Sequence, residues 1–332
     1  MPSGIEPVMK PSIQVDASCL EPIRRHLASR IIGQQNLVDS ILVTLLSDGH
    51  LLVEGLPGLA KTTAIKAMAE AIEGDYHRIQ FTPDLLPSDL VGTDIYREDR
   101  AEFEFRPGPI FHNILLADEV NRAPAKVQSA LLEAMAERQV TVGQKTYPLP
   151  RLFMVLATQN PIEQEGTYHL PEAQLDRFLM HVIVGYPSKE EELKILELDS
   201  RQQREPPSPP AQVVSQQTLF AAREAVAEVY LDRRLQHYIV DLVHASRTPE
   251  HFDADLARWL RFGASPRATL ALARCARARA WLEGEDYVSP EHVQAMAPQI
   301  LRHRLLLSFE GEAEGITADD VIARLIQVVA VP

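Results

Sequence analysis

A glycine-rich loop near the start of the chain has the residue types that bind phosphate. Residues 55–62 read Gly-Leu-Pro-Gly-Leu-Ala-Lys-Thr, between an apolar run at 51–53 and a helical pattern that begins near Thr63. Such a turn lets successive backbone N–H groups converge on phosphate oxygens, and the N-terminus of the next helix attracts the same anion. Lys61 can reach the β- and γ-phosphates, and Thr62 can ligate Mg²⁺. The loop predicts a site for a nucleoside triphosphate, lined by Leu56, Pro57, Gly58, Leu59, Ala60, Lys61, Thr62 and Thr63.

One position departs from the usual pattern of this loop. Ala60 stands where a second glycine normally precedes the lysine, and its methyl group narrows the room for phosphate. Taken alone, the stretch could be an ordinary Gly/Pro turn between a strand and a helix. Further side chains with matching chemistry favour the phosphate site.

Two acids follow the apolar run at 114–117. A carboxylate at such a strand end can hold the water shell of Mg²⁺, and a second one can polarise the attacking water. We therefore assign Asp118 to the metal and Glu119 to general-base catalysis. An apolar run ended by two acids is ordinary by itself, so this assignment depends on the phosphate loop that precedes it.

A polar side chain ends the next predicted strand as well. Asn160 follows the run at 153–157 and would lie at the same sheet edge as the two acids. Its amide could orient the attacking water or contact the γ-phosphate. The alternative is an Asn-Pro turn that only ends the strand.

Two arginines complete the candidate set. Arg177 follows Asp176 just before the last predicted strand, in a segment that could equally be a surface helix with an Asp-Arg pair. Arg267 lies at a helix start, where Ser265 suits the N-cap and Pro266 the first helical position. A cation there opposes the helix dipole, which hints at an anionic partner.

Short apolar runs alternate with helical patterns over the first half of the chain. This alternation predicts an α/β fold with a parallel sheet covered by helices, and nucleotide at the carboxyl ends of the strands. The predicted strands are 51–53, 79–81, 114–117, 153–157 and 180–184, with helices at 63–72 and 127–137.

Two insertions and a second domain are expected around this core. Residues 89–109 include a strand-like alternation at 102–106, and 139–149 read as a hairpin with its turn near Gly143. A proline-rich stretch at 205–210 marks a linker. Helical patterns follow at 217–229, 235–246, 267–281, 290–307 and 318–329. The predicted domains are an irregular arm (1–18), an αβα core (19–187), a connecting helix with the linker (188–211) and an all-α lid (212–332).

Composition narrows the classes of function. The chain has 332 residues and a formal net charge of -13, which argues against a surface built to neutralise nucleic acid. Cys19 and Cys275 fit neither a disulfide framework nor a metal cluster, so we expect a reducing compartment. No apolar run approaches the ~20 residues of a membrane span, and the first residues lack the pattern of a signal peptide. The expected location is the cytoplasm, without membrane contact.

In this order the motifs resemble those of the AAA+ ATPases, specifically the MoxR family. The resemblance covers about Arg30 to Leu307, and its most specific stretches are 31–34, 54–62, 105–110, 117–124 and 170–178. The family also carries alanine before the lysine, which accounts for Ala60. One departure is His169, where the family usually has proline.

The resemblance implies further roles for single residues. It places Ile32 and Gly33 near the adenine of ATP or ADP, and makes Asn160 sensor 1, Arg177 the arginine finger and Arg267 sensor 2. It also makes 89–109 a helix-2 insert and 138–152 a presensor hairpin.

It further implies ATP hydrolysis with Mg²⁺ at the subunit interfaces of a homo-oligomeric ring, a hexamer. The ring would act as a chaperone on client proteins, including proteins with von Willebrand factor A domains. Two alternatives stay open, a nucleic-acid-dependent motor and a magnesium-chelatase-type motor subunit. The first is disfavoured because Arg138, Lys145 and Arg151 are the only basic residues around the hairpin and its aromatic residues are sparse.

Overall fold

A computed structural model describes residues 15–56, 58–59, 61–161, 168, 170–204 and 208–332. Its centre is a five-stranded parallel sheet in the order β2-β5-β8-β1-β9. The strands are β1 (Leu51–Gly55), β2 (Tyr76–Gln80), β5 (Ile114–Asp118), β8 (Met154–Gln159) and β9 (Met180–Val184). The predicted α/β class is confirmed.

Strand β2 was placed too late by the sequence pattern. The structure begins it at Tyr76 and ends it at Gln80, so Phe81 lies outside. As an edge strand it carries polar residues that are partly buried or exposed, and an apolar run therefore does not mark it. Strand β8 was placed too early instead, because it runs from Met154 to Gln159, one residue later than predicted at its start and two at its end.

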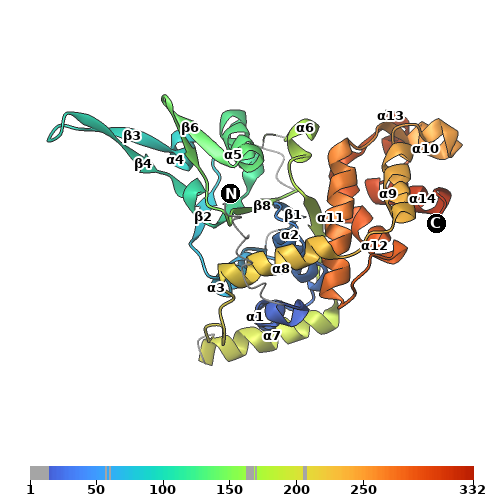
Figure 1. Ribbon diagram of the computed structural model, residues 1–332, viewed down its shortest axis with the longest axis horizontal. Helices are drawn as coiled ribbons and strands as arrows, with labels where there is room; N and C mark the ends of the chain where they lie inside the picture. Colours follow the sequence, from blue (N-terminus) through green and yellow to red (C-terminus); the bar gives the residue numbers. More distant parts are fainter. Residues whose placement is uncertain (1–14, 57, 60, 162–167, 169, 205–207) are drawn as a thin grey trace, which may run out of the picture.

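Helices cover both faces of the sheet (Figure 1). Alternate residues of the buried strands point to opposite faces. Leu51 and Val53 join the apolar cluster of α1 (Glu21–Arg30), α2 (Gln35–Leu46) and α3 (Lys61–Glu70). Leu52 joins a second cluster with α4 (Pro87–Val91) and α5 (Ala125–Glu137). The two clusters fix which face each strand residue points to. They therefore also determine which side chains lie at the carboxyl end of each strand.

Two hairpins project from the core at the upper left of Figure 1. The first pairs β3 (Gly92–Arg97) with β4 (Glu102–Pro107), and the second pairs β6 (Gln139–Val142) with β7 (Lys145–Pro148). The pattern at 102–106 is therefore a strand, as predicted, but its partner β3 was not anticipated. Phe105 and Tyr147 stack at 4.1 Å between ring centroids, which joins the two hairpins.

Beyond the core the chain is mainly helical. A short α6 (Glu172–Leu175) precedes β9, and the long α7 (Lys189–Arg204) follows it. Helix α8 (Gln216–Glu228) is the first helix of the region predicted to be the lid (212–332). The lid contains α9 (Arg233–Ala245), α10 (Ala254–Trp259), α11 (Pro266–Leu282), α12 (Pro290–Leu301), α13 (Phe309–Ala313) and α14 (Ala318–Val328).

Two expectations about secondary structure were wrong. The helix predicted at 290–307 ends at Leu301, because Arg302–Arg304 form a 3₁₀ turn and Leu306–Leu307 (β11) pair with Leu260–Phe262 (β10). The lid is therefore not purely helical. The arm predicted to be irregular through residue 18 already enters a 3₁₀ helix at Ala17, capped by Asp16.

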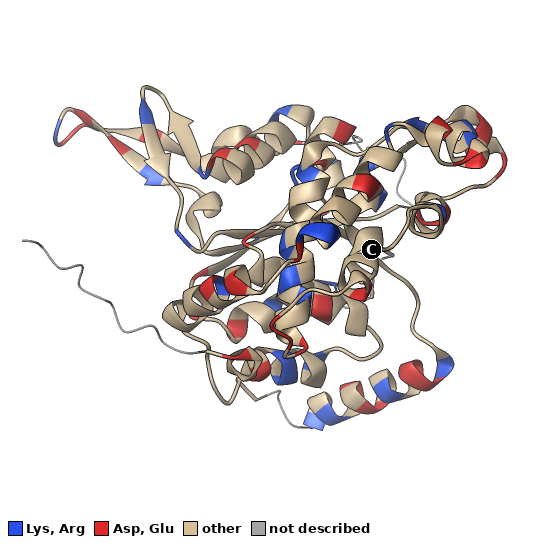
Figure 2. Ribbon diagram, turned by 45° about the vertical axis from the view of Figure 1, so that its right-hand side comes forward, with Lys and Arg blue, Asp and Glu red and all other residues tan. Residues whose placement is uncertain are grey.

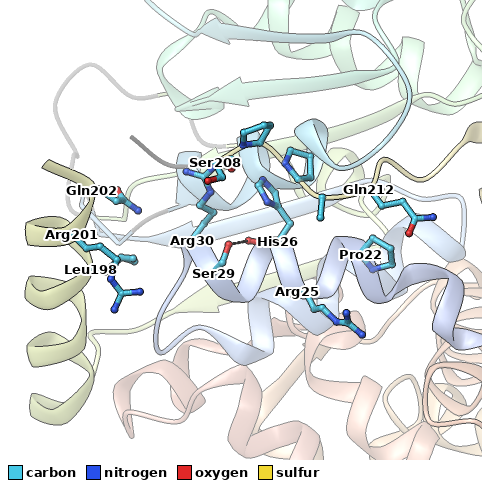
Figure 3. A pocket seen from close by; sticks show the side chains of 13 residues that line it. Pro22, Arg25, His26, Ser29, Arg30, Leu198, Arg201, Gln202, Ser208 and Gln212 are labelled. Atoms are coloured by element: carbon cyan, nitrogen blue, oxygen red, sulfur yellow. Dashed lines mark hydrogen bonds between the residues drawn. The ribbon is translucent and has the colours of Figure 1, made fainter. Parts of the chain in front are cut away.

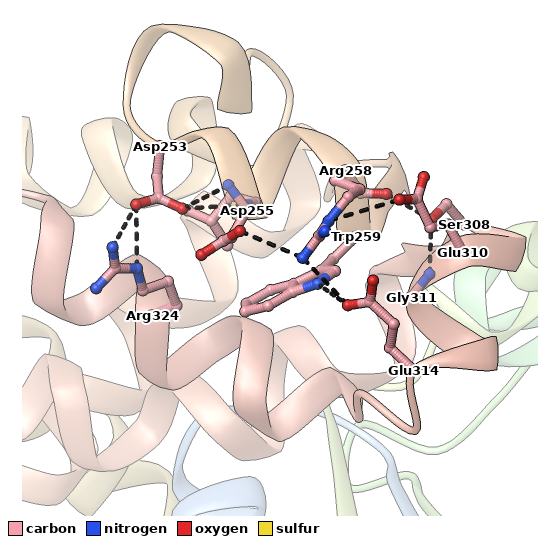
Figure 4. Close-up of polar contacts among 10 residues, drawn as sticks. Asp253, Asp255, Arg258, Trp259, Ser308, Glu310, Gly311, Glu314 and Arg324 are labelled. Atoms are coloured by element: carbon pink, nitrogen blue, oxygen red, sulfur yellow. Dashed lines mark hydrogen bonds and ion pairs between the residues drawn. The ribbon is translucent and has the colours of Figure 1, made fainter.

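Side-chain hydrogen bonds and ion pairs join α10 to the last two helices of the chain (Figure 4). Trp259 donates its indole N–H to Glu314 at 3.0 Å, and Arg258 lies 3.2 Å from the same carboxylate. Arg324 on α14 pairs with Asp253 at the N-cap of α10. These contacts bind α10 to α13 and α14.

The lid and the core share one apolar cluster, and a buried ion pair lies between them. Nε of Arg304 lies 2.7 Å from Oδ1 of Asp176, and the arginine side chain is 3% exposed. Its guanidinium also donates to the carbonyls of Phe178 and Leu179. The 3₁₀ turn that ends α12 thus positions an arginine that bonds the lid to the start of β9.

Candidate functional site

The phosphate loop joins the carboxyl end of β1 to the N-terminus of α3. Gly58 has a φ of 84°, in the left-handed region that favours glycine, and a Cβ there would meet no atom within 4 Å. Its glycine is therefore needed for backbone conformation and not for space. Pro57 and Ala60 lie outside the described residues.

Lys61 lies between two strand ends. Its Nζ donates to the carbonyl of Gly55 and, at 3.2 Å, to the carbonyl of Gln159. Burial lowers the pKa of Lys61, and the carboxylates of Asp118 and Glu119 act in the opposite direction. The ammonium therefore points to the place where β1 and β8 end beside the acids of β5.

A cavity of about 370 Å³ brings most of the candidate residues together. It lies at the carboxyl edge of the sheet, as expected for a doubly covered parallel sheet. Its lining comprises Gly58, Leu59, Lys61, Thr62, Thr63, Asp118, Glu119, Thr158 and Asn160.

Asp118 is buried and held from two sides. Its Oδ1 accepts a hydrogen bond from Oγ1 of Thr158 at 2.5 Å, and its Oδ2 lies 2.5 Å from Nη2 of Arg78. The side chain therefore has a fixed orientation at the end of β5. A carboxylate and the hydroxyl of Thr62 in one cavity are the oxygen ligands that Mg²⁺ prefers, so these two residues fit the metal.

Glu119 lies one residue beyond the strand in a left-handed conformation, with φ 56° and ψ 51°. Its backbone N–H donates to Oγ1 of Thr158 at 2.9 Å. Its Oε2 accepts from Gln80 at 2.6 Å and from Arg122 at 3.0 Å. Because of the left-handed turn, the side chains of Asp118 and Glu119 point in different directions. Gln80 and Arg122 hold the Glu119 carboxylate in place.

Three of these neighbours were missed by the sequence reasoning. Arg78 and Gln80 alternate along β2, and Thr158 lies two residues before Asn160 on β8. The sequence does place each of these residues near the end of a strand. Their position beside the acids could be inferred only from the strand order β2-β5-β8, which puts the ends of β2 and β8 on both sides of the acids.

Asn160 lies directly beyond β8 and is 5% exposed. Its carbonyl lies 3.5 Å from the amide nitrogen of Asn121, which comes from the turn after Glu119. The predicted placement beside the acids therefore holds.

Ile32 and Gly33 do not line the cavity. They lie between α1 and α2, where Gly33 has a φ of 75° and a Cβ would come within 2.7 Å of the Glu191 carboxyl carbon. The next residue, Gln34, donates its side-chain amide to the carbonyl of Gly185 at 3.1 Å. The pair thus lies beside the segment between β9 and α7, and its contact with adenine stays a prediction.

Arg177 and Arg267 line a second cavity, of about 340 Å³. Nη1 of Arg177 donates to the carbonyl of Leu132 at 2.7 Å, and Nη1 of Arg267 lies 4.0 Å from Oδ2 of Asp176. Ser265 caps α11 and Pro266 starts it, as the sequence predicted. The structure therefore brings the two arginines together, but away from the phosphate loop. His169, which precedes this segment, lies outside the described residues.

A cluster of two acids and a histidine on the lid does not suit metal binding. Glu283, Glu285 and His292 gather on the lid. Nδ1 of His292 accepts the backbone N–H of Ser289 at 2.9 Å, so the neutral ring carries its proton on Nε2, which faces Glu283 at 2.9 Å. A metal on Nε2 would require the opposite tautomer.

Fold and cavity together define a nucleotide hydrolase of the phosphate-loop class. Residues 50–180 match the ATPase family associated with various cellular activities (AAA), and residues 255–325 match the AAA lid domain.

Relatives narrow the class. The chain is 50% identical over 303 residues to chaperone MoxR1 of Mycobacterium tuberculosis, covering 91% of this chain and 79% of that protein. It is 35% identical over 294 residues to the protein MoxR of Paracoccus denitrificans, covering 84% and 86%. A crystal structure from Cytophaga hutchinsonii, assigned as an ATPase, superposes with a TM-score of 0.88 at 44% identity, covering 95% and 96%. The chain belongs to the MoxR family of AAA+ ATPases, and its enzyme class is ATP hydrolase.

The part of the chain that the structure describes has no helix both long and apolar enough to cross a bilayer.

Proposed function

We propose that the chain binds ATP and Mg²⁺ in the cavity at the phosphate loop and hydrolyses ATP between adjacent subunits of a hexameric ring. Its use would be to remodel or activate client proteins, including proteins with von Willebrand factor A domains. The name of the relative at 50% identity, chaperone MoxR1, supports protein clients. We place this work in the cytoplasm.

The lining of the cavity supports roles for Lys61, Thr62, Asp118, Glu119 and Asn160, and the family resemblance suggests one for Ile32 and Gly33. Thr62 and Asp118 would hold Mg²⁺, which neutralises charge on the phosphates when bound. Lys61 would bind the β- and γ-phosphates, and Glu119 would accept the proton of the attacking water. Asn160, at the same edge, would orient that water. Ile32 and Gly33 would contact the adenine.

The observation that carries the proposal is the separation of two sets of residues. The phosphate loop, both acids and Asn160 line one cavity, whereas Arg177 and Arg267 line another. Arg78 and Arg122 lie beside the two acids but are paired with Asp118 and Glu119, and neither Arg177 nor Arg267 is among the residues that line the cavity of the phosphate loop. Arg177 of one subunit would complete the site of the next, and Arg267, which shares its cavity, would act in trans as well.

A mixing experiment tests this arrangement. Arg177→Ala should fold and bind ATP but hydrolyse it about 10³-fold or more slowly, as arginine fingers in comparable sites do. Lys61→Ala should lack ATP binding. Mixed rings of the two variants should recover activity, because an intact loop on one chain can meet an intact arginine on another. Steady-state phosphate release measures this, and mixed rings without recovery would refute the in-trans role.

A nucleic-acid motor remains the alternative of another class. The net charge of -13 and the three basic residues around the hairpin speak against it, because phosphate contacts supply most nonspecific affinity. We expect no binding of single- or double-stranded DNA at physiological salt, with or without ATP. A salt-sensitive submicromolar complex, or ATPase stimulation by DNA, would favour the motor instead. A magnesium-chelatase-type subunit would differ chiefly in its client.

A further inference from the structure

Many ion pairs of this chain join an arginine to an acid that does not line the nucleotide cavity. Basic and acidic residues are interspersed over the ribbon (Figure 2). In the cavity of about 430 Å³ between α1 and α7 (Figure 3), for example, Arg30 lies 3.8 Å from Glu70 and donates to the carbonyl of Ser208. Arg78 is different, because its partner is Asp118, the carboxylate proposed to hold Mg²⁺.

Arg78 reaches Asp118 from the neighbouring edge strand. In the register of β2 and β5, Arg78 lies opposite Leu116, and Gln80 lies opposite Asp118. The side chain of Arg78 therefore extends along the sheet toward its carboxyl edge. There Nε and Nη2 of the guanidinium lie 3.1 and 2.5 Å from one oxygen, Oδ2 of Asp118. Both contacts are charge-assisted hydrogen bonds, and both engage an acid that lines the nucleotide cavity.

The two oxygens of Asp118 have partners of different kinds. Oδ1 accepts the hydroxyl of Thr158, which is neutral and can stay in place beside a bound cation. Oδ2 faces a guanidinium, which carries a full positive charge at any ordinary pH. A carboxylate has enough lone pairs for several partners, so space alone does not exclude a metal. The obstacle is charge, because two cations at one carboxylate repel each other at short range.

Arg78 can leave this position at low cost. Its side chain is 49% exposed, whereas that of Asp118 is 11% exposed. Among the described residues, the one other hydrogen bond of the Arg78 guanidinium is to Oε1 of Gln80, at 3.2 Å. A half-exposed guanidinium that turns away regains water, so little stability is lost when it moves. The buried carboxylate instead needs a cation nearby, which either the arginine or a metal supplies.

We propose that Arg78 is a displaceable counter-ion of Asp118 that competes with Mg²⁺ for this carboxylate. It thereby sets the Mg²⁺ concentration at which a nucleotide binds together with its metal. This inference rests on the proposed binding of Mg²⁺ by Thr62 and Asp118, and it adds a residue that lowers the affinity of that site. An arginine that only oriented Asp118 would have the opposite effect, because its loss would weaken metal binding.

Nucleotide binding at different Mg²⁺ concentrations tests the competition. A fluorescent ADP analogue is titrated onto the full chain at a series of free Mg²⁺ concentrations, in identical solutions for every variant. Arg78→Gln should lower the Mg²⁺ concentration of half-maximal effect about 10-fold or more, equivalent to ~1.4 kcal/mol in metal binding. Binding is the readout rather than turnover, because Arg78 also contacts Gln80, which holds the proposed base Glu119.

Two further variants show whether the effect passes through Asp118. Arg122→Gln removes a positive charge beside Glu119 instead, so it should shift the half-maximal Mg²⁺ concentration by less than about 3-fold. Asp118→Asn should weaken the response to Mg²⁺. Adding Arg78→Gln to Asp118→Asn should bring no further change, because the carboxylate for which the two cations compete is then absent.

Binding of the analogue without Mg²⁺ reports whether each variant folds. Arg78 is not among the residues that line the cavity, so Arg78→Gln should bind the metal-free analogue within about 3-fold of the parent. If Arg78→Gln fails this check, Arg78→Met replaces it, since methionine keeps an unbranched apolar stem without the charge.

The outcomes separate this inference from the proposed function. An unchanged Mg²⁺ requirement of Arg78→Gln overturns the competition, and a raised one shows that Arg78 orients Asp118 instead. An equal shift from Arg122→Gln, or a shift that persists with Asp118→Asn, would reveal a general charge effect and overturn it as well. A parent chain that binds the analogue with no dependence on Mg²⁺, or that keeps the full dependence with Asp118→Asn, would instead refute the proposed metal site.

Discussion

Gln80 on β2 donates its side-chain amide to Oε2 of Glu119 at 2.6 Å, and Arg122 lies 3.0 Å from the same oxygen. Glu119 lies beyond β5, so the hydrogen bond joins two neighbouring strands. Its acceptor is the proposed base. A base works only when its oxygen points at the proton it removes, so the two donors help to set its direction.

Replacement of Gln80 should therefore affect turnover more than binding. We expect Gln80→Ala to lower kcat for ATP about 10-fold with little change in KM, because the phosphate cradle stays intact. Gln144→Ala, at the exposed hairpin turn, is the matched control. A raised KM with unchanged kcat would show that Gln80 acts on binding.

The two acids and the lysine should separate binding from chemistry. Lys61→Ala should lose ATP binding, whereas Glu119→Gln should bind ATP and lose ~10²–10⁴ in rate, the usual contribution of a general base. Equilibrium binding of a fluorescent ATP analogue and steady-state phosphate release distinguish the two. Parent-like hydrolysis by Glu119→Gln would show that another group is the base.

Arg304 should matter for the stability of the whole chain. Its removal leaves the Asp176 carboxylate and the carbonyls of Phe178 and Leu179 without their buried partner. We expect Arg304→Ala to lower the free energy of unfolding by about 3 kcal/mol, measured by denaturant titration. The exposed Arg261→Ala should change it by less than about 0.5 kcal/mol. Equal effects of both variants would contradict the role of the buried pair.

His50 predicts how stability depends on pH. Burial, helped by the charge of Arg138, lowers the pKa of its imidazole to about 4. Its Nδ1 accepts the backbone N–H of Val155 at 3.0 Å, so protonation would break that bond. The unfolded chain takes up the proton near the ordinary pKa of ~6.5, so stability is full above that value and falls as pH drops toward 4.

The measurement is the unfolding free energy from pH 7.5 to 4.5. Burial also lowers the pKa of His303, so part of the slope belongs to that residue. His50→Gln should be less stable at pH 7 but should show a shallower decline below pH 6.5. If the unfolding free energies of parent and variant fall equally steeply with pH, His50 does not contribute to the pH dependence.

Local patterns were enough to predict the sheet, the phosphate loop and the acid pair. Alternation of apolar runs and helical periods marks a parallel core, and Lys61, Thr62, Asp118 and Glu119 lie within a few residues of strand ends. The contacts that hold these groups could not be predicted. Thr158 meets Asp118 only because β8 lies beside β5 in space, and Arg304 meets Asp176 across 128 positions of sequence. Such pairs depend on strand order and lid placement, which no local pattern encodes.

Asp176 immediately precedes Arg177 and accepts a hydrogen bond from Ser265 at 2.8 Å, in addition to its pair with Arg304. Ser265 caps the helix that begins beside Arg267. Two lid residues, Ser265 and Arg304, therefore hold the carboxylate of the residue directly before Arg177. In the proposed ring, where Arg177 would meet the neighbour's γ-phosphate, the lid of one subunit would thus be coupled through Asp176 to hydrolysis in the next.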